Sequence, residues 1–228
     1  MHMGSREETP GLWQGYLWAP RLWPDLLLAI KGPFLEALAH SSTLGGEHGH
    51  QLRRLFTFAC LEILQAFSEA EVRSSLRVLS ADELTDIVWA LGNHLEHTVD
   101  RAEEQWARRV RPFIDRYWPH DHAHKSAAVS AAFADLVLKT GNAFPSAVAA
   151  TKKFLIPVGD SDMLPYKLGE DSAHFVAAFP EAVLELLDLT TSNAGGSHYG
   201  LREVLERLLV ASPNFKKDRR FQHLEKNT

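Results

Sequence analysis

Apolar residues recur every three or four positions along most of this chain, which is the spacing that places them on one face of an α-helix. The clearest run lies between His50 and Phe67, where the apolar positions are Leu52, Leu55, Phe56, Ala59, Cys60, Ile63 and Phe67. A second apolar strip on the same helix predicts that other helices cover it on more than one side; its members are Phe58, Leu61 and Leu64. The Gly-rich stretch from Leu44 to Gly49 predicts a loop before this helix.

Three later segments also predict helices. Ser80-Ala-Asp-Glu83 fits a capping box, in which the serine accepts from the third amide and the glutamate reaches back, so a helix should begin there. The apolar spacing from Trp106 to Tyr117 predicts another helix, with Pro112 either in its first turn or at a kink. The alanine-rich segment from Ser126 to Lys139 predicts an inner helix, because small side chains allow close packing.

The second half of the chain repeats a short phrase. Phe144-Pro-Ser-Ala-Val148 and Phe179-Pro-Glu-Ala-Val183 lie 35 residues apart, and in each the proline fits the first turn of a helix. Proline recurs at intervals of 33, 35 and 33 residues, at Pro112, Pro145, Pro180 and Pro213. A pair of antiparallel helices with two turns occupies such an interval in a helical-repeat array. No segment shows the alternation of a β-strand, so we predict an all-α stack of antiparallel helix pairs.

Length and composition favour one such domain. The chain has 228 residues, of which 45% are hydrophobic and 23% charged, with a formal net charge of −5. Its only cysteine, Cys60, excludes an internal disulfide framework and a Cys-based zinc ribbon. Neither a membrane-spanning run nor a signal peptide is apparent, so we expect a cytoplasmic protein without membrane contact. Residues 1–11 should be a cloning-derived or disordered leader, and residues 12–228 a single helical-repeat domain.

Twelve histidines raise the question of a metal site. The sharpest cluster is His120, His122 and His124, which could serve a metal-dependent enzyme if the segment were extended. The alternative is a polar turn in which Asp121 or Ser126 caps the following helix. We favour the turn, expect no cofactor, and lean against an enzyme without excluding one.

Nucleophilic and phosphate sites have weaker support. Cys60 lies on an apolar helix stripe, where a buried, unreactive thiol is usual. The Gly-rich loop from Gly195 to Gly200 precedes a helix but lacks the strand and the Lys-Ser/Thr ending of a P-loop, so we predict a flexible connection with Ser197 as the helix cap.

Two groups of residues are candidates for interaction with a partner. The N-terminal aromatic group consists of Trp13, Tyr16, Trp18 and Trp23. The C-terminal basic run consists of Lys216, Lys217, Arg219 and Arg220. The aromatic residues could anchor an interface or cover the end of a helical stack. The basic run could contact phosphates or an acidic protein, but the chain is acidic overall and we do not expect nucleic acid as its partner.

Several phrases in combination resemble a known group of proteins. They are Trp23-Pro-Asp-Leu26, Lys31-Gly-Pro-Phe-Leu-Glu-Ala-Leu38, Trp106-Ala-Arg-Arg-Val-Arg-Pro-Phe113, Tyr117-Trp-Pro119, the two Phe-Pro-x-Ala-Val units, and Leu201-Arg-Glu-Val-Leu-Glu-Arg-Leu-Leu209. Over most of residues 12–225 the chain is similar to the HEAT-like helical C-terminal regions of large bacterial proteins, including sirtuin-like proteins associated with antiphage defence. The resemblance implies a HEAT-like α-solenoid at the recognition or assembly end of a longer protein. Its catalytic module would lie in another part of that protein.

The sequence therefore predicts a protein-interaction, sensing or assembly module. Its partner would be another protein, the remainder of a longer chain, or a second copy of itself. The alternatives are the metal-dependent enzyme at the histidine cluster and nucleic-acid binding through the C-terminal basic run.

Overall fold

The regular structure of this protein is entirely helical in the part that the structure describes. A computed structural model describes residues 24–44, 46–63, 65–98, 101–121, 124–159, 163–191 and 198–228. Within these ranges, strand-like pairing is limited to one isolated parallel bridge between Val158 and Thr191. The prediction of an all-α protein is confirmed for these residues. None of their helices combines the length and the apolar character needed to cross a bilayer.

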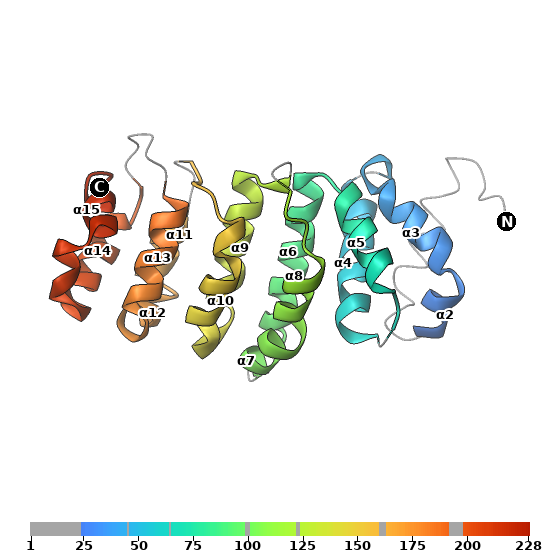
Figure 1. The fold of residues 1–228 in the computed structure, drawn as a ribbon, viewed down its shortest axis with the longest axis horizontal. Helices are drawn as coiled ribbons and strands as arrows, with labels where there is room; N and C mark the ends of the chain where they lie inside the picture. Colours follow the sequence, from blue (N-terminus) through green and yellow to red (C-terminus); the bar gives the residue numbers. More distant parts are fainter. Residues whose placement is uncertain are drawn as a thin grey trace.

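The main helices form two layers in an elongated row (Figure 1). The first layer contains α4 (Gly46–Glu62), α6 (Ala81–Glu96), α9 (Ala127–Leu138), α11 (Leu164–Gly169) with α12 (Ala173–Ala178), and α14 (Leu201–Ala211). The second layer contains α3 (Lys31–Ala39), α5 (Glu69–Val78), α8 (Arg111–Tyr117), α10 (Phe144–Thr151), α13 (Pro180–Thr190) and α15 (Arg219–Glu225). Each helix packs mainly on its neighbours in the row, and the C-terminus lies at the end formed by α14 and α15.

Shorter elements precede, extend or connect these helices. They are α2 (Pro24–Ala29), α7 (Ala102–Gln105), the π-helical turn η3 (Trp106–Val110), and the 3-10 turns η1 (Ser41–Thr43), η5 (Gly141–Ala143), η6 (Lys152–Phe154) and η7 (Pro213–Lys217). In the π turn the Arg111 N–H donates to the carbonyl of Trp106, five residues earlier. Pro112 follows directly; a proline ring clashes with the carbonyl four residues before it, and the wider turn relieves that clash.

Aromatic side chains fill the space between the two layers. Phe144 at the start of α10 stacks on Phe175 of α12, with ring centroids 4.5 Å apart, and Phe179 lies 6.2 Å from both. One helix pair earlier, Phe133 contacts both Trp118 and Phe154. Because fully burying such a ring contributes about 1.5–3 kcal/mol, these clusters hold successive helix pairs together.

Side-chain hydrogen bonds cap the N-termini of α5, α6 and α9. Ser80 and Glu83 form the expected capping box at the N-terminus of α6, and Ser68 and Glu71 form a second one at α5. Ser126 caps α9 by accepting from the Val129 N–H. These bonds satisfy amide groups that the first helical turn leaves without partners.

Two of the recurring prolines occupy the same position. Pro145 and Pro180 each lie in the first turn of a second-layer helix, as predicted. Pro112 lies instead inside continuous helical backbone, directly after the π turn, and Pro213 lies in the 3-10 turn before α15. Two consecutive helix pairs therefore begin their second helix in the same way.

Two boundaries differ from the predictions. The helix expected from His50 to Phe67 begins earlier, at Gly46, and ends at Glu62, before a turn in which Gln65 adopts a positive φ of 59°. Gly49 therefore lies inside the helix, although its neighbourhood predicted a loop. A Cβ atom at Gly49 would meet the carbonyl oxygen of Ser41 at 2.5 Å, so the glycine permits close contact with η1.

The expected helix cap at Ser197 is also wrong. Helix α14 begins at Leu201, and its N-cap is Gly200, which has a φ of +83° and offers no side-chain bond. The backbone of Gly200 packs against Tyr166, and this contact sets the start of the helix.

Candidate functional site

Two hollows open between helices of the first layer. The histidine hollow, between α4 and α6, has a volume of about 170 Å³; the residues that define it are Arg54, Phe58, Leu61, Ala90, His94 and His97. The tyrosine hollow, between α11 and α14, has a volume of about 380 Å³; it is lined by Tyr166, Gly169, Glu170, Tyr199, Gly200, Arg202, Glu203 and Glu206. Small-molecule pockets usually occupy about 300–1,000 Å³, so the histidine hollow is suited to a single side chain.

The histidine hollow combines an apolar lining with polar groups at its edge. The Nε2 atom of His94 lies 3.3 Å from Gln105 Oε1 and 3.4 Å from Glu62 Oε1, and the side chain is 13% exposed. His97 is exposed at the C-cap of α6. His94 therefore lies at the edge of the apolar lining, and His97 lies at the surface.

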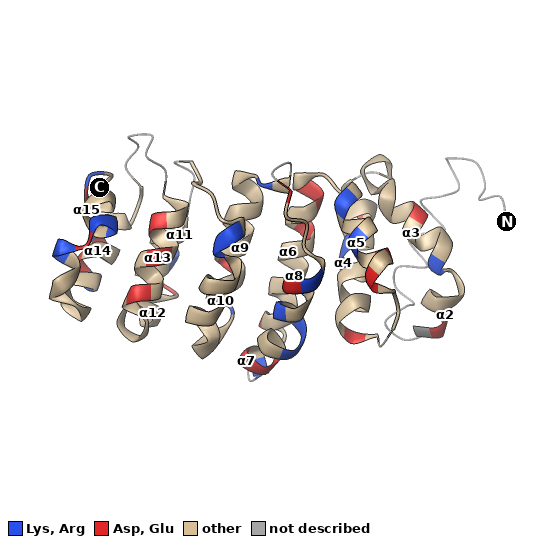
Figure 2. Ribbon diagram, in the orientation of Figure 1, with Lys and Arg blue, Asp and Glu red and all other residues tan. Residues whose placement is uncertain are grey.

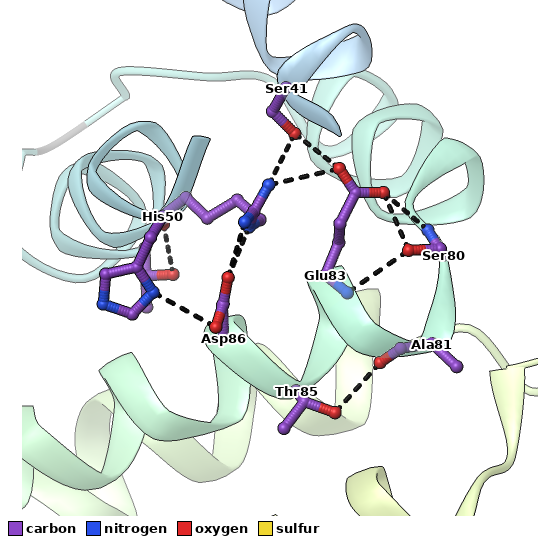
Figure 3. Close-up of polar contacts among 9 residues, drawn as sticks. Ser41, His50, Ser80, Ala81, Glu83, Thr85 and Asp86 are labelled. Atoms are coloured by element: carbon purple, nitrogen blue, oxygen red, sulfur yellow. Dashed lines mark hydrogen bonds and ion pairs between the residues drawn. The ribbon is translucent and has the colours of Figure 1, made fainter. Parts of the chain in front are cut away.

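A cluster of polar side chains fixes the two helices that form this hollow (Figure 3). Arg53 of α4 is 7% exposed, and its Nε and Nη2 atoms lie 2.8 and 2.6 Å from Asp86 Oδ2 on α6. Its Nη1 atom donates to Ser41 Oγ at 2.8 Å and to Glu83 Oε1 at 3.1 Å. His50 completes the cluster, with Nδ1 3.1 Å from Asp86 Oδ1.

The electrostatics of this cluster favour ionised carboxylates. Burial alone would raise the pKa of Glu83, but hydrogen bonds from Ser41 and Ser80 and the charge of Arg53 outweigh it. The pKa of Glu83 therefore lies below its usual 4.5. Since Ser41 is 1% exposed and already donates to Glu83, its hydroxyl is not accessible to a substrate. We interpret this cluster as a clamp between α4 and α6.

The tyrosine hollow has exposed aromatic rings and carboxylates. Tyr199 is 70% exposed and Tyr166 is 37% exposed, and their ring centroids lie 5.5 Å apart with an interplanar angle of 35°. Glu203 Oε1 accepts from Arg207 Nη2 at 2.6 Å, and Arg207 Nη1 also donates to the carbonyl of Gly169. Arg207 thereby connects α14 to the end of α11 beneath the hollow's acidic edge.

The predicted histidine cluster is described only in part. His120 stacks on Phe154, with ring centroids 5.6 Å apart, and His124 Nε2 lies 3.3 Å from the carbonyl oxygen of Arg77. His122 lies outside the described residues. Among the residues that are described, no three His, Cys, Asp or Glu side chains form a group that could hold a metal ion. The metal-dependent enzyme therefore stays a prediction of the sequence.

The C-terminal basic run divides into two kinds of residue. Lys216, Lys217 and Arg219 are exposed on η7 and at the start of α15. Arg220 is held by Asp218 and Glu181, and these bonds raise its pKa further above its usual value. Charges of both signs are spread along the rest of the row, so the run is not part of a continuous basic surface (Figure 2). Residues Trp13, Tyr16, Trp18 and Trp23 of the N-terminal aromatic group lie outside the described residues.

Cys60 is half-buried at the edge of the hydrophobic core, where the sequence predicted a buried thiol. It packs against the hydrophobic core of α4, and burial raises the pKa of its thiol well above the usual value of 9.0. A thiol in this state is not poised as a nucleophile.

Sequence reasoning missed both the clamp and the tyrosine hollow. Tyr166 and Tyr199 lie 33 residues apart and belong to different helix pairs, so no local pattern brings them together. Two local features of the sequence mark this site. Tyr199 stands beside Gly200, and the amphipathic helix that follows has two glutamates in its first two turns, Glu203 and Glu206.

No protein-family model matches this chain, and neither does any curated protein or solved structure.

Proposed function

We propose that this chain is a HEAT-like helical-repeat stack that acts as a protein-interaction, sensing or assembly module. Support for the repeat comes from successive helix pairs along the row, two of which have a proline, Pro145 or Pro180, in the first turn of the second helix. Each pair exposes one face of its first helix, and stacking joins these faces into a long surface suited to a protein partner.

The observation that carries the proposal is the position of the two hollows. Both open between helices of the first layer, one near each end of the described row. Each combines partly exposed aromatic or apolar side chains with charged groups, which is the composition of an anchoring site for side chains of a partner. A partner that reaches both hollows would favour the curvature of the row that fits it best, and it would thereby select one conformation.

The resemblance of the sequence extends the proposal to a biological role. We assign the chain to the regulatory or assembly end of a bacterial defence protein, with a separate catalytic module under its control. Binding of a partner to the first layer would then change the activity of that catalytic module.

The test is to recover the partner from cells that make the protein naturally and to map the contact by crosslinking mass spectrometry. Arg54→Glu in the histidine hollow and Tyr199→Ala in the tyrosine hollow should each reduce recovery of the partner. Val78→Ala is the matched control, because Val78 is 59% exposed on α5 in the second layer. Crosslinks confined to the second layer, with unchanged recovery by both hollow variants, would contradict the proposal.

A further inference from the structure

The tyrosine hollow carries an excess of negative charge beside exposed aromatic rings. Its lining contains the carboxylates of Glu170, Glu203 and Glu206 and the guanidinium of Arg202, and Arg207 pairs with Glu203, so one carboxylate is in excess. Glu170 is exposed and forms no side-chain hydrogen bond or ion pair with any described residue. Arg202 is 83% exposed and pairs with Glu206 four residues later, and such an exposed ion pair is weak. At least one carboxylate is therefore available to an incoming cation.

The geometry of the two rings decides how a cation can bind. Their centroids lie 5.5 Å apart, whereas a group sandwiched between two rings needs about 7 Å, twice the contact distance of carbon atoms. A ligand therefore stacks on the outer face of Tyr199, the more exposed ring. Aromatic rings attract cations through the negative potential of their faces, and arginine also stacks through its planar guanidinium.

We propose that the tyrosine hollow binds an arginine side chain from an extended basic segment of a partner protein. The guanidinium stacks on Tyr199 and donates to the carboxylates of Glu170 and Glu206. This inference rests on the proposed interaction function and names the chemistry of one contact in it. Arginine fits better than lysine, because its planar fork can stack on a ring and bond a carboxylate at the same time.

Selective labelling of tyrosine gives a direct test. The chain has four tyrosines, so an NMR spectrum of the full chain with ¹³C-labelled tyrosine rings has few signals. The probe is the acetylated peptide Gly-Arg-Gly-Arg-Gly-Arg, and the matched control peptide carries neutral citrulline in place of each arginine. We expect saturable shifts at Tyr166 and Tyr199, no shift at Tyr117 of α8, and affinity for the citrulline peptide that is weaker by about tenfold or more.

Variants locate the contact. Tyr199→Ala should abolish the shift at Tyr166, and Glu170→Gln should weaken binding by about threefold to tenfold. Glu104→Gln on α7 removes an exposed carboxylate far along the row and should leave the affinity unchanged. Equal shifts with the citrulline peptide, an unchanged affinity in Glu170→Gln, or no shift at millimolar peptide would overturn the inference. If the peptide fails while Arg54→Glu still reduces recovery of the natural partner, the inference falls and the proposed function stands.

Discussion

Gly200 lies directly against the backbone of Tyr166. A Cβ atom added at Gly200 would meet Tyr166 Cα at 3.0 Å and Tyr166 N at 3.1 Å, and the φ of Gly200 is +83°. Side chains other than glycine rarely adopt this conformation. The contact joins the start of α14 to α11, so it positions the two rings of the tyrosine hollow.

Replacing this glycine should therefore destabilise the fold. Gly200→Ala imposes a left-handed conformation on alanine and a steric overlap, and should lower the free energy of unfolding by about 1–3 kcal/mol. Gly46→Ala is the control, since nothing lies within 4 Å of a Cβ at that exposed position in the first turn of α4. The control should stabilise the protein by up to about 1 kcal/mol, because alanine favours helix. Urea denaturation compares the two, and an equal effect of both substitutions would contradict the prediction.

Arg53 should contribute far more to stability than its neighbour Arg54. Arg53→Ala leaves the carboxylates of Glu83 and Asp86 without their buried partner, and such losses cost about 3–5 kcal/mol. Arg54 is only half-buried and forms no ion pair with the described residues, so Arg54→Ala should change stability by about 0.5 kcal/mol or less. The same denaturation measurement distinguishes the variants. Comparable losses in both would show that the clamp does not stabilise the packing of α4 on α6.

The clamp also predicts how stability depends on pH. The pKa of Glu83 is lower in the folded protein than its ordinary 4.5, so the folded state binds fewer protons at this site than the unfolded state. The stabilisation is complete above about pH 4.5 and is lost as the pH falls through the folded value. Glu83→Gln should therefore show a smaller loss of stability than the wild type between pH 7 and pH 3. The variant should retain some dependence of stability on pH, because the pKa values of Glu71 and Asp218 are also lowered in the folded protein.

The thiol of Cys60 should react slowly in the folded protein. Burial raises its pKa, so almost none of the reactive thiolate is present at pH 8. Iodoacetamide labelling followed by mass spectrometry should give little modification of the native chain and complete modification in guanidinium chloride. Rapid labelling of the native chain would show that α4 opens readily or that the thiol is accessible.

Sequence reasoning succeeded where a structure is set by neighbouring residues. The capping box at Ser80 and Glu83 and the first-turn positions of Pro145 and Pro180 follow from local spacing. It failed where a distant contact decides the outcome. Gly49 lies inside α4 and its missing Cβ makes room for the carbonyl of Ser41, a contact that no pattern around the glycine reveals. The tyrosine hollow likewise depends on how two helix pairs stack.

The neighbour-to-neighbour packing of the row has a mechanical consequence. Because the principal contacts join adjacent helices and not distant ones, the two ends of the described row are coupled only through every pair between them. Small rotations between neighbouring helix pairs therefore add up to a larger bend of the whole row. The distance between the histidine and tyrosine hollows spans several of these interfaces, so a bend of the row or a force along it changes the spacing of the two hollows.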